Sequence, residues 1–352
     1  MIDLDDAASV RAADPGGMLE AVAKLPKDCA AGYARGIEVD GLPTPDGVTS
    51  VTVCGMGGSA VSGDVMRALF RERLAIPVEV VRSPVLPEYC GPHTLVICSS
   101  YSGDTAEALA CFEEARSRGC RILPITSGGA LGGRAVEAGL AVVAVPGELP
   151  PRAALGHLAF GMLGALERTG LLPSLSSQVA ECVRTLEELA SHLGPDVRVP
   201  QNGAKELALR IQGCVPVVWG AEGLGSVAAA RWKTQLNENA KTPAFWSSMP
   251  ELDHNEVVGW TSGTGDGFHV VALRHQDEHP DVAARFGLSL EIAGEAGANT
   301  SEVRAVGLSP LSRLLSLVVH GDFMSVYLAL ARGVDPTPVE AIDRLKRSLA
   351  GR

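Results

Sequence analysis

The stretch Val-Thr-Val-Cys-Gly-Met-Gly-Gly-Ser-Ala-Val-Ser-Gly-Asp, residues 51–64, indicates how this chain folds. Its β-branched start is typical of a buried parallel strand, and glycines follow at once. Beyond the glycines, Val65, Leu69 and Phe70 form an apolar helical face. A strand that enters a helix through glycines directs backbone N–H groups and the helix dipole toward an anion. The stretch therefore predicts an α/β sheet with an anion-binding turn.

The same alternation of strand and helix continues in both directions from this turn. Strands are expected at residues 51–54, 78–81, 94–98, 121–125 and 141–145, and again at 215–219, 268–273 and 302–305. Helical stretches at 224–239 and 281–293 separate the strands of the second set. Such alternation is typical of parallel sheets covered by helices on both faces. We expect an α/β protein with two doubly wound, flavodoxin-like halves.

Turn-forming residues suggest where the two halves meet. Helical stretches at 155–169 and 178–193 are followed by the helix breakers Gly194, Pro195 and Pro200. We therefore expect an N-terminal domain over residues 1–194 and a C-terminal domain over residues 195–352. The chain should end in two helices, at 311–331 and 339–349.

Composition excludes several classes of protein. The chain has 352 residues, a net charge of -11 and 46% hydrophobic residues, which indicates a globular protein and argues against a nucleic-acid surface. The apolar stretches at 153–166 and 311–319 are shorter than the roughly 20 residues of a membrane span. The acidic N-terminus does not resemble a secretory signal. The eight cysteines form no Cys-x-x-Cys pair, so we expect a cytoplasmic protein with reduced thiols and no metal.

A second polar turn follows the third expected strand. It reads Ser-Ser-Tyr-Ser-Gly-Asp-Thr over residues 99–105, and its hydroxyl groups can donate several hydrogen bonds to one phosphate. In an open α/β sheet, two such turns should meet at one crevice. A dinucleotide fingerprint (Gly55, Gly57, Ala60) is the alternative, but Arg82 stands where the ribose-binding acid is expected.

This pair of turns resembles the sugar isomerase (SIS) domain, and the whole chain is similar to the bifunctional phosphoglucose/phosphomannose isomerase family. The resemblance extends over residues 55–64, 100–105, 231–241, 250–260 and 321–349. It implies a substrate-binding set that comprises Gly57, Gly58, Ser59, Ser100, Ser102 and Thr105. One departure is Asp104, where the family commonly has Asn. A carboxylate beside a phosphate would repel it, so Asp104 must point away, cap the helix that follows, or weaken binding.

The resemblance also implies the catalytic residues. Glu238 corresponds to the base that moves a proton between two carbons, and His254 and Lys346 correspond to the residues that open the sugar ring. Arg152 corresponds to the arginine that stabilises the enediolate. Without the resemblance, each would be read as an ordinary surface or turn residue. Thr337, a short residue near Lys346, is a candidate for leaving room for both C2 epimers.

These assignments predict an enzyme of carbohydrate metabolism that interconverts glucose 6-phosphate or mannose 6-phosphate with fructose 6-phosphate. The expected route is a cis-enediol, with no metal and no cofactor. The resemblance further implies a homodimer in which His254 reaches the site of the neighbouring subunit. Two alternatives remain at this stage: a catalytically silent protein that binds sugar phosphates, and an NAD(P)-dependent oxidoreductase.

Overall fold

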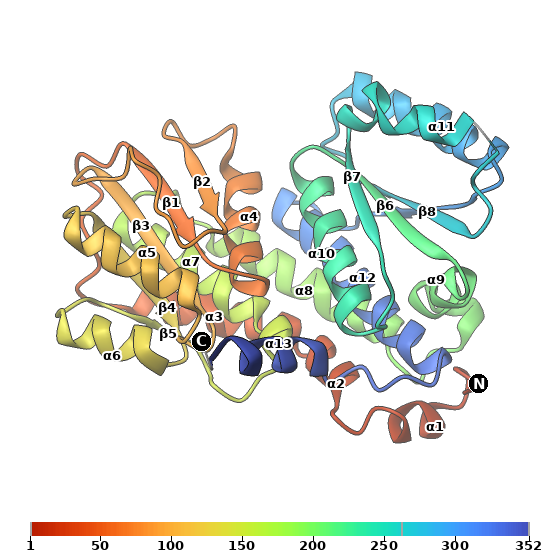
Figure 1. The fold of residues 1–352 in the computed structure, drawn as a ribbon, viewed down its shortest axis with the longest axis horizontal. Helices are drawn as coiled ribbons and strands as arrows, with labels where there is room; N and C mark the ends of the chain where they lie inside the picture. Colours follow the sequence, from red (N-terminus) through yellow and green to blue (C-terminus); the bar gives the residue numbers. More distant parts are fainter. Residues whose placement is uncertain (1, 262, 351–352) are drawn as a thin grey trace.

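The computed structural model describes residues 2–261 and 263–350, and it contains two parallel sheets (Figure 1). The first sheet has the order β2-β1-β3-β4-β5 and the second the order β7-β6-β8-β9. Their strands are β1 (Ser50–Cys54), β2 (Val78–Val81), β3 (Thr94–Ser100), β4 (Arg121–Thr126), β5 (Val143–Ala144), β6 (Val215–Ala221), β7 (Phe245–Met249), β8 (Phe268–Arg274) and β9 (Asn299–Arg304). The predicted class, two helix-flanked parallel sheets, is confirmed.

Helices cover both faces of each sheet. In the first half, α3 (Leu25–Glu38), α4 (Gly58–Phe70) and α7 (Leu155–Thr169) cover one face and α5 (Ala106–Ser117) and α6 (Gly129–Glu137) the other. In the second half, α9 (Gly203–Ile211), α10 (Leu224–Glu238) and α12 (Pro310–Ala331) face α11 (Pro280–Glu295) across the sheet. The remaining helices are α1 (Ala7–Ala12), α2 (Met18–Ala23), α8 (Ser176–Leu193) and α13 (Glu340–Ala350).

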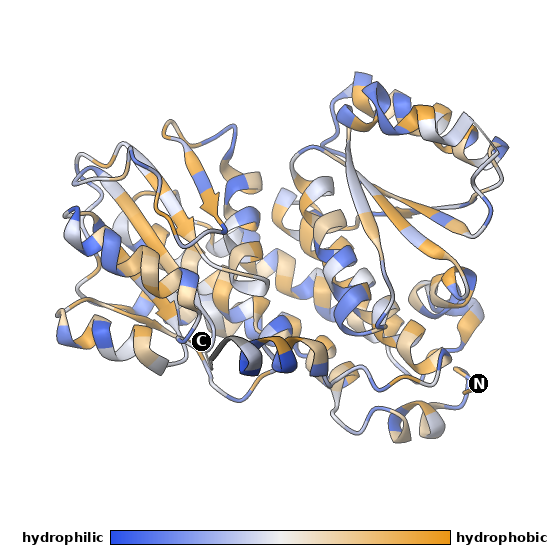
Figure 2. Cartoon of the chain, viewed as in Figure 1, coloured by the Kyte–Doolittle hydropathy of each residue, from blue (hydrophilic) through white to orange (hydrophobic). Residues whose placement is uncertain are grey.

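The apolar core runs from one half into the other. Figure 2 shows apolar colours along the strands and polar colours on the outer faces of the helices. At the centre lies α12, which packs against α8, α9 and α10. It is the one helix of the described chain that is long and apolar enough to cross a membrane, but 94% of its most apolar window is buried in the protein. This helix therefore forms the part of the apolar core that the two halves share.

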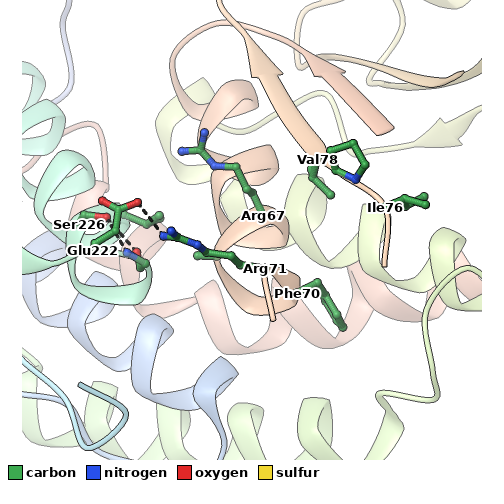
Figure 3. Close-up of a pocket in the computed structure, with 11 residues that line it drawn as sticks. Arg67, Phe70, Arg71, Ile76, Val78, Glu222 and Ser226 are labelled. Carbon is green, nitrogen blue, oxygen red and sulfur yellow. Dashed lines mark hydrogen bonds and ion pairs between the residues drawn. The ribbon is translucent and has the colours of Figure 1, made fainter. Parts of the chain in front are cut away.

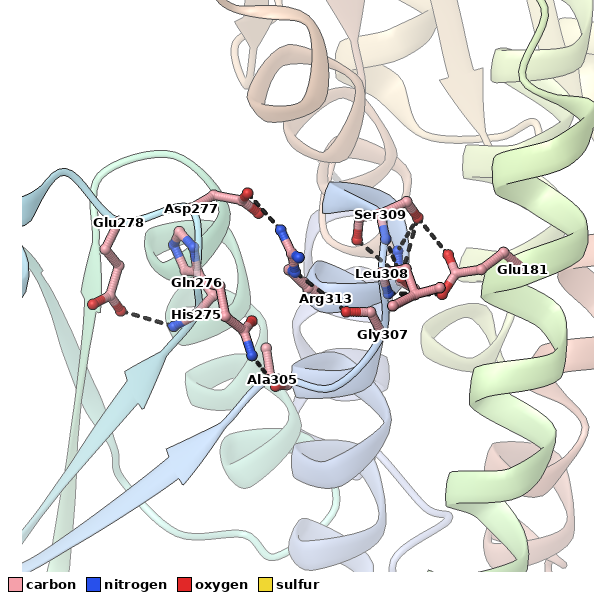
Figure 4. A network of polar contacts seen from close by, with 11 residues as sticks. Glu181, His275, Gln276, Asp277, Glu278, Ala305, Gly307, Leu308, Ser309 and Arg313 are labelled. Carbon is pink, nitrogen blue, oxygen red and sulfur yellow. Dashed lines mark hydrogen bonds and ion pairs between the residues drawn. The ribbon is translucent and has the colours of Figure 1, made fainter.

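Polar contacts also join the second sheet to the helices beneath it (Figure 4). Glu181 of α8 accepts a hydrogen bond from Ser309 at 2.7 Å, just before α12 begins. Arg313, in the first turn of α12, pairs with Asp277 at 2.5 Å in the loop after β8. These contacts fix the carboxyl end of β8 relative to α8 and α12.

The expected strands differ from the observed ones chiefly at three places. β7 was not expected, and it is an edge strand whose residues lack the alternation of apolar and polar side chains. β5 spans only two of the five residues expected, and β9 begins three residues before its expected start. Near the N-terminus, Asp5 contacts Val199 and Arg11 contacts Asp196, both in the second half of the chain. The domain boundary at residue 194 stays a prediction.

Candidate active site

The glycine turn after β1 is shaped by close packing. Gly57 has φ 53° and ψ -129°, a conformation that favours glycine, and it precedes the first turn of α4. A Cβ on Gly55 would lie 2.8 Å from the backbone oxygen of Ser99, and one on Gly58 would lie 3.2 Å from that of Pro151. The first turn therefore packs directly against the second turn and against the segment that carries Arg152.

The second turn lies beside the first, as expected. β1 and β3 are neighbours in the sheet, with Cys54 opposite Cys98. The backbone N–H of Tyr101 donates to the Ser59 hydroxyl at 3.1 Å, which links the two turns. Within the second turn, the Ser100 hydroxyl donates to that of Thr105 at 3.0 Å. Ser59 and Ser100 are buried, whereas Ser102 is exposed, so the side chains of the two turns range from buried to exposed.

The carboxylate of Asp104 has a partner of its own. Its Oδ1 accepts a hydrogen bond from the backbone N–H of Ala130 at 2.9 Å, in the first turn of α6. A carboxylate in this position is stabilised by the helix dipole. Of the three outcomes that the sequence left open, capping of a helix is the one that the structure shows. The helix that it caps is α6, however, rather than α5.

Arg152 is the most buried of the four predicted catalytic residues. Its exposed fraction is 5%, and burial lowers the pKa of its guanidinium. Nε donates to Asn239 at 2.7 Å, and Nη2 donates to the backbone oxygens of Pro336 and Thr337 at 2.7 and 2.9 Å. Nη1 makes no hydrogen bond within the described chain and lies 4.0 Å from the Glu238 carboxylate. One end of the guanidinium is thus fixed, and its other nitrogen faces Glu238.

A buried ion pair holds Arg152 from behind. The guanidinium of Arg231 binds both carboxylate oxygens of Asp322, at 3.1 and 2.8 Å, and also donates to the backbone oxygen of Arg152 at 2.7 Å. Asn239, which holds the Arg152 side chain, donates to Ser325 at 2.9 Å. The sequence assigned no role to any of these supporting residues, although all four lie within the stretches 231–241 and 321–349 that resemble the family.

Glu238 lies at the end of α10. Its side chain is 29% exposed, so it is partly shielded from water yet open to a ligand. The Lys241 ammonium donates to the Glu238 backbone oxygen at 2.6 Å and to that of Pro336 at 2.9 Å, and burial lowers the pKa of Lys241. These contacts, together with Arg152, tie the end of α10 to the segment after α12.

His254 lies at the opposite end of α10 from Glu238. The backbone N–H of Glu222, just before α10, donates to Met249 O at 2.9 Å, and His254 follows in a short 3-10 helix (Glu251–His254). The 15 residues of α10 span about 22 Å. His254 is exposed, and its ring makes no hydrogen bond within the part of the chain that the structure describes. Within one chain, His254 is therefore not part of the Glu238 cluster.

Lys346 and Thr337 lie in the C-terminal segment. Lys346 is on α13, whose residues 340–348 are all exposed, including Ile342 and Leu345. Thr337 is closer to Arg152, which donates to its backbone oxygen, and its own hydroxyl is buried without a hydrogen-bond partner. A Cβ on Gly16 would collide with that hydroxyl, so Gly16 leaves the space that Thr337 occupies.

The chain is similar to known proteins over most of its length. Residues 200–349 match the family model of the bacterial phospho-glucose isomerase C-terminal SIS domain. The bifunctional phosphoglucose/phosphomannose isomerase of Caldicellulosiruptor bescii is 36% identical over 335 residues, which cover 95% of this chain and 99% of the relative. The protein of the same description from Aquifex aeolicus is 36% identical, with coverages of 85% and 90%.

Similarity in structure extends over the whole chain. A solved structure from Thermus thermophilus, described as a glucose-6-phosphate isomerase like protein, matches with a TM-score of 0.66 and 19% identity, and covers 99% of both chains. Two helix-flanked parallel sheets, with hydroxyl-rich turns at the ends of neighbouring strands, define a protein of the SIS class. Within that class, the chain belongs to the bifunctional phosphoglucose/phosphomannose isomerase family.

Proposed function

We propose that this protein interconverts glucose 6-phosphate and mannose 6-phosphate with fructose 6-phosphate through a cis-enediol. The observation that carries the proposal is the position of Glu238 beside the free nitrogen of Arg152, whose backbone segment packs against the first hydroxyl-rich turn. A base and a cation side by side are what proton transfer between neighbouring carbons requires. Membership of the family favours this function over the silent binding protein and the oxidoreductase.

The proposed mechanism begins with the substrate phosphate. Gly57, Gly58 and Ser59 hold it from the first turn, and Ser100, Ser102 and Thr105 hold it from the second. Neutral donors and helix N-termini then satisfy its oxygens and keep the far end of the sugar in one position.

Proton transfer follows the opening of the ring. His254 and Lys346 open the sugar, and Glu238 removes the proton from one carbon and returns it to the next. The free Arg152 Nη1 donates to the oxygen on which negative charge develops. None of these steps uses a metal or a cofactor, and the described residues contain no group of three or more His, Cys, Asp or Glu arranged to hold a metal ion.

An assay on the purified protein tests the function directly. Formation of fructose 6-phosphate from each aldose phosphate, coupled to a dehydrogenase and measured with EDTA present, should proceed with both substrates. Activity with neither sugar phosphate would reject the proposal, and activity that disappears with chelator would reject its metal-independent form.

The phosphate assignment predicts a change in the Michaelis constant. Ser102→Ala combined with Thr105→Val removes two donors from the second turn and should raise KM for both substrates about tenfold or more, because each hydrogen bond to a charged group contributes about 1.5–3 kcal/mol. Ser102 is exposed, but Thr105→Val also removes the acceptor of the Ser100 hydroxyl, so thermal unfolding is measured in parallel. An unchanged KM would show that the phosphate binds elsewhere.

We propose further that the active form is a cytoplasmic homodimer in which His254 serves the partner's site. The separation of His254 from Glu238 along α10 supports the sharing. The eight free cysteines support a reducing compartment. The expected domains at 1–194 and 195–352 would then each contribute to two sites in the dimer.

Mixing two inactive variants tests the sharing of the site. A hybrid of Glu238→Gln and His254→Ala subunits contains one site with both native residues, so mixing should restore up to about a quarter of wild-type activity per subunit if subunits pair at random. Subunit exchange is verified with affinity tags of two kinds. Tagged hybrids that stay inactive would contradict a shared site.

A further inference from the structure

A charged cavity lies beside the candidate active site, between α4 and α10. It encloses about 330 Å³, and Gly57 of the first turn forms part of its wall. Its cations come from both halves of the chain, with Arg67 and Arg82 from the first and Lys233 from the second. None of these three residues has a role in the proposed isomerisation.

The charges in this cavity do not balance. Asp64 is the one carboxylate in its wall, and it binds Arg67 at 3.2 Å and also pairs with Arg82. Burial raises the pKa of Asp64, while the two arginines oppose that rise. Lys233 is half-buried and makes no hydrogen bond or ion pair with the described residues. Three cations thus face one carboxylate, and two positive charges lack a counter-ion.

A neighbouring cavity shows the contrasting case (Figure 3). It encloses about 350 Å³ and shares Arg67 and Ser226 with the first. Arg67 and Arg71 extend from α4 toward the start of α10, where Glu222 binds Arg71 at 3.1 Å. The cation–carboxylate pair at that end is complete, so the unbalanced charge lies at the end nearer to Gly57.

We propose that Lys233, Arg82 and Arg67 form a second anion-binding site that takes a dianionic phosphate group. A phosphate monoester carries a charge of about -1.5 to -2 at pH 7, which matches the two unpaired cations. Guanidinium groups bind phosphate oxygens in pairs, and an ammonium adds a point charge. Arg67 lies on α4, Arg82 directly follows β2, and Lys233 lies on α10, so a bound phosphate links the two halves of the chain beside the active site. The site takes orthophosphate or the phosphate of a sugar ester.

Calorimetric titration with orthophosphate tests this proposal. Wild type should bind two equivalents per chain, one at the serine turns and one in the cavity. Lys233→Met should bind one equivalent, at the serine turns, with the affinity of the cavity lowered tenfold or more. Lys233→Arg should still bind two equivalents. The Ser102→Ala, Thr105→Val variant should also bind one, and its combination with Lys233→Met none. Arg184→Met, which removes an exposed cation from α8, is the matched control and should bind two.

Other results of these titrations would distinguish the cavity site from the site at the serine turns. Two equivalents in Lys233→Met would overturn the cavity site, and loss of both would show that the cavity belongs to a single phosphate site. A wild type that binds one equivalent, lost in Lys233→Met but kept in the serine variant, supports the cavity and rejects the serine turns. If Lys233→Met changes the oligomeric state, the cavity holds an acidic group of a second chain, and the proposal fails. Titration of the serine variant with glucose 6-phosphate distinguishes the two sources of the phosphate. Binding of one equivalent would show that the cavity takes the phosphate of a sugar ester, and no binding would show that it takes orthophosphate alone.

Discussion

Glu238→Gln is expected to abolish turnover of both glucose 6-phosphate and mannose 6-phosphate. The amide keeps the shape of the side chain but cannot accept a proton, and general base catalysis contributes about 10²- to 10⁴-fold to rates. An enediol is planar at C2, so removal of the proton erases the difference between the two epimers. One base can therefore serve both substrates, and kcat should fall by the same factor for each.

Binding should survive this substitution. Glu238 is not among the groups assigned to the phosphate, so the affinity for sorbitol 6-phosphate, an open-chain analogue, should change less than about threefold. Glu187→Gln, an exposed glutamate on α8, is the matched control and should keep full activity. Loss of one activity with retention of the other would mean that the two epimers use different bases.

Local sequence patterns predicted the frame of the site. The β1 strand, the glycine turn and α4 follow from signals within some 20 consecutive residues, because strand propensity, turn chemistry and helix periodicity agree there. The meeting of the two turns follows from a general rule of parallel sheets, which place the carboxyl ends of neighbouring strands at one edge. The link from Tyr101 to Ser59 is the structural result of that rule.

Contacts between distant residues could not be predicted in the same way. Arg231 and Asp322 are 91 positions apart, and a single sequence gives no signal that they pair. The position of His254 depends on β7, an edge strand without a clear pattern, so its distance from Glu238 emerged only from the fold. The hydrogen bond between Asp104 and α6 could not be predicted either, because α6 is near Asp104 in space but distant in sequence.

Arg152→Met is expected to cause the second large loss of activity. In the proposed mechanism the free Nη1, 4.0 Å from the Glu238 carboxylate, donates to the oxygen on which negative charge develops, and removal of one such preorganised donor costs about 10²- to 10³-fold in kcat. The donor acts on the transition state, so KM should change little. Arg152→Lys keeps the positive charge, but one ammonium cannot donate to Asn239, two backbone oxygens and the substrate together. This variant should therefore recover only a small part of the activity lost in Arg152→Met.

Two inhibitors separate this effect from a general loss of structure. A sugar-phosphate hydroxamate resembles the planar enediolate, and its affinity should fall in Arg152→Met by about the same factor as kcat/KM. Sorbitol 6-phosphate has no such planar group and should bind about as it does to wild type. Because Asn239 and the backbone oxygens of Pro336 and Thr337 lose their donor, thermal unfolding is measured in parallel. Equal loss of affinity for both inhibitors would mean that Arg152 shapes the pocket rather than stabilising the enediolate.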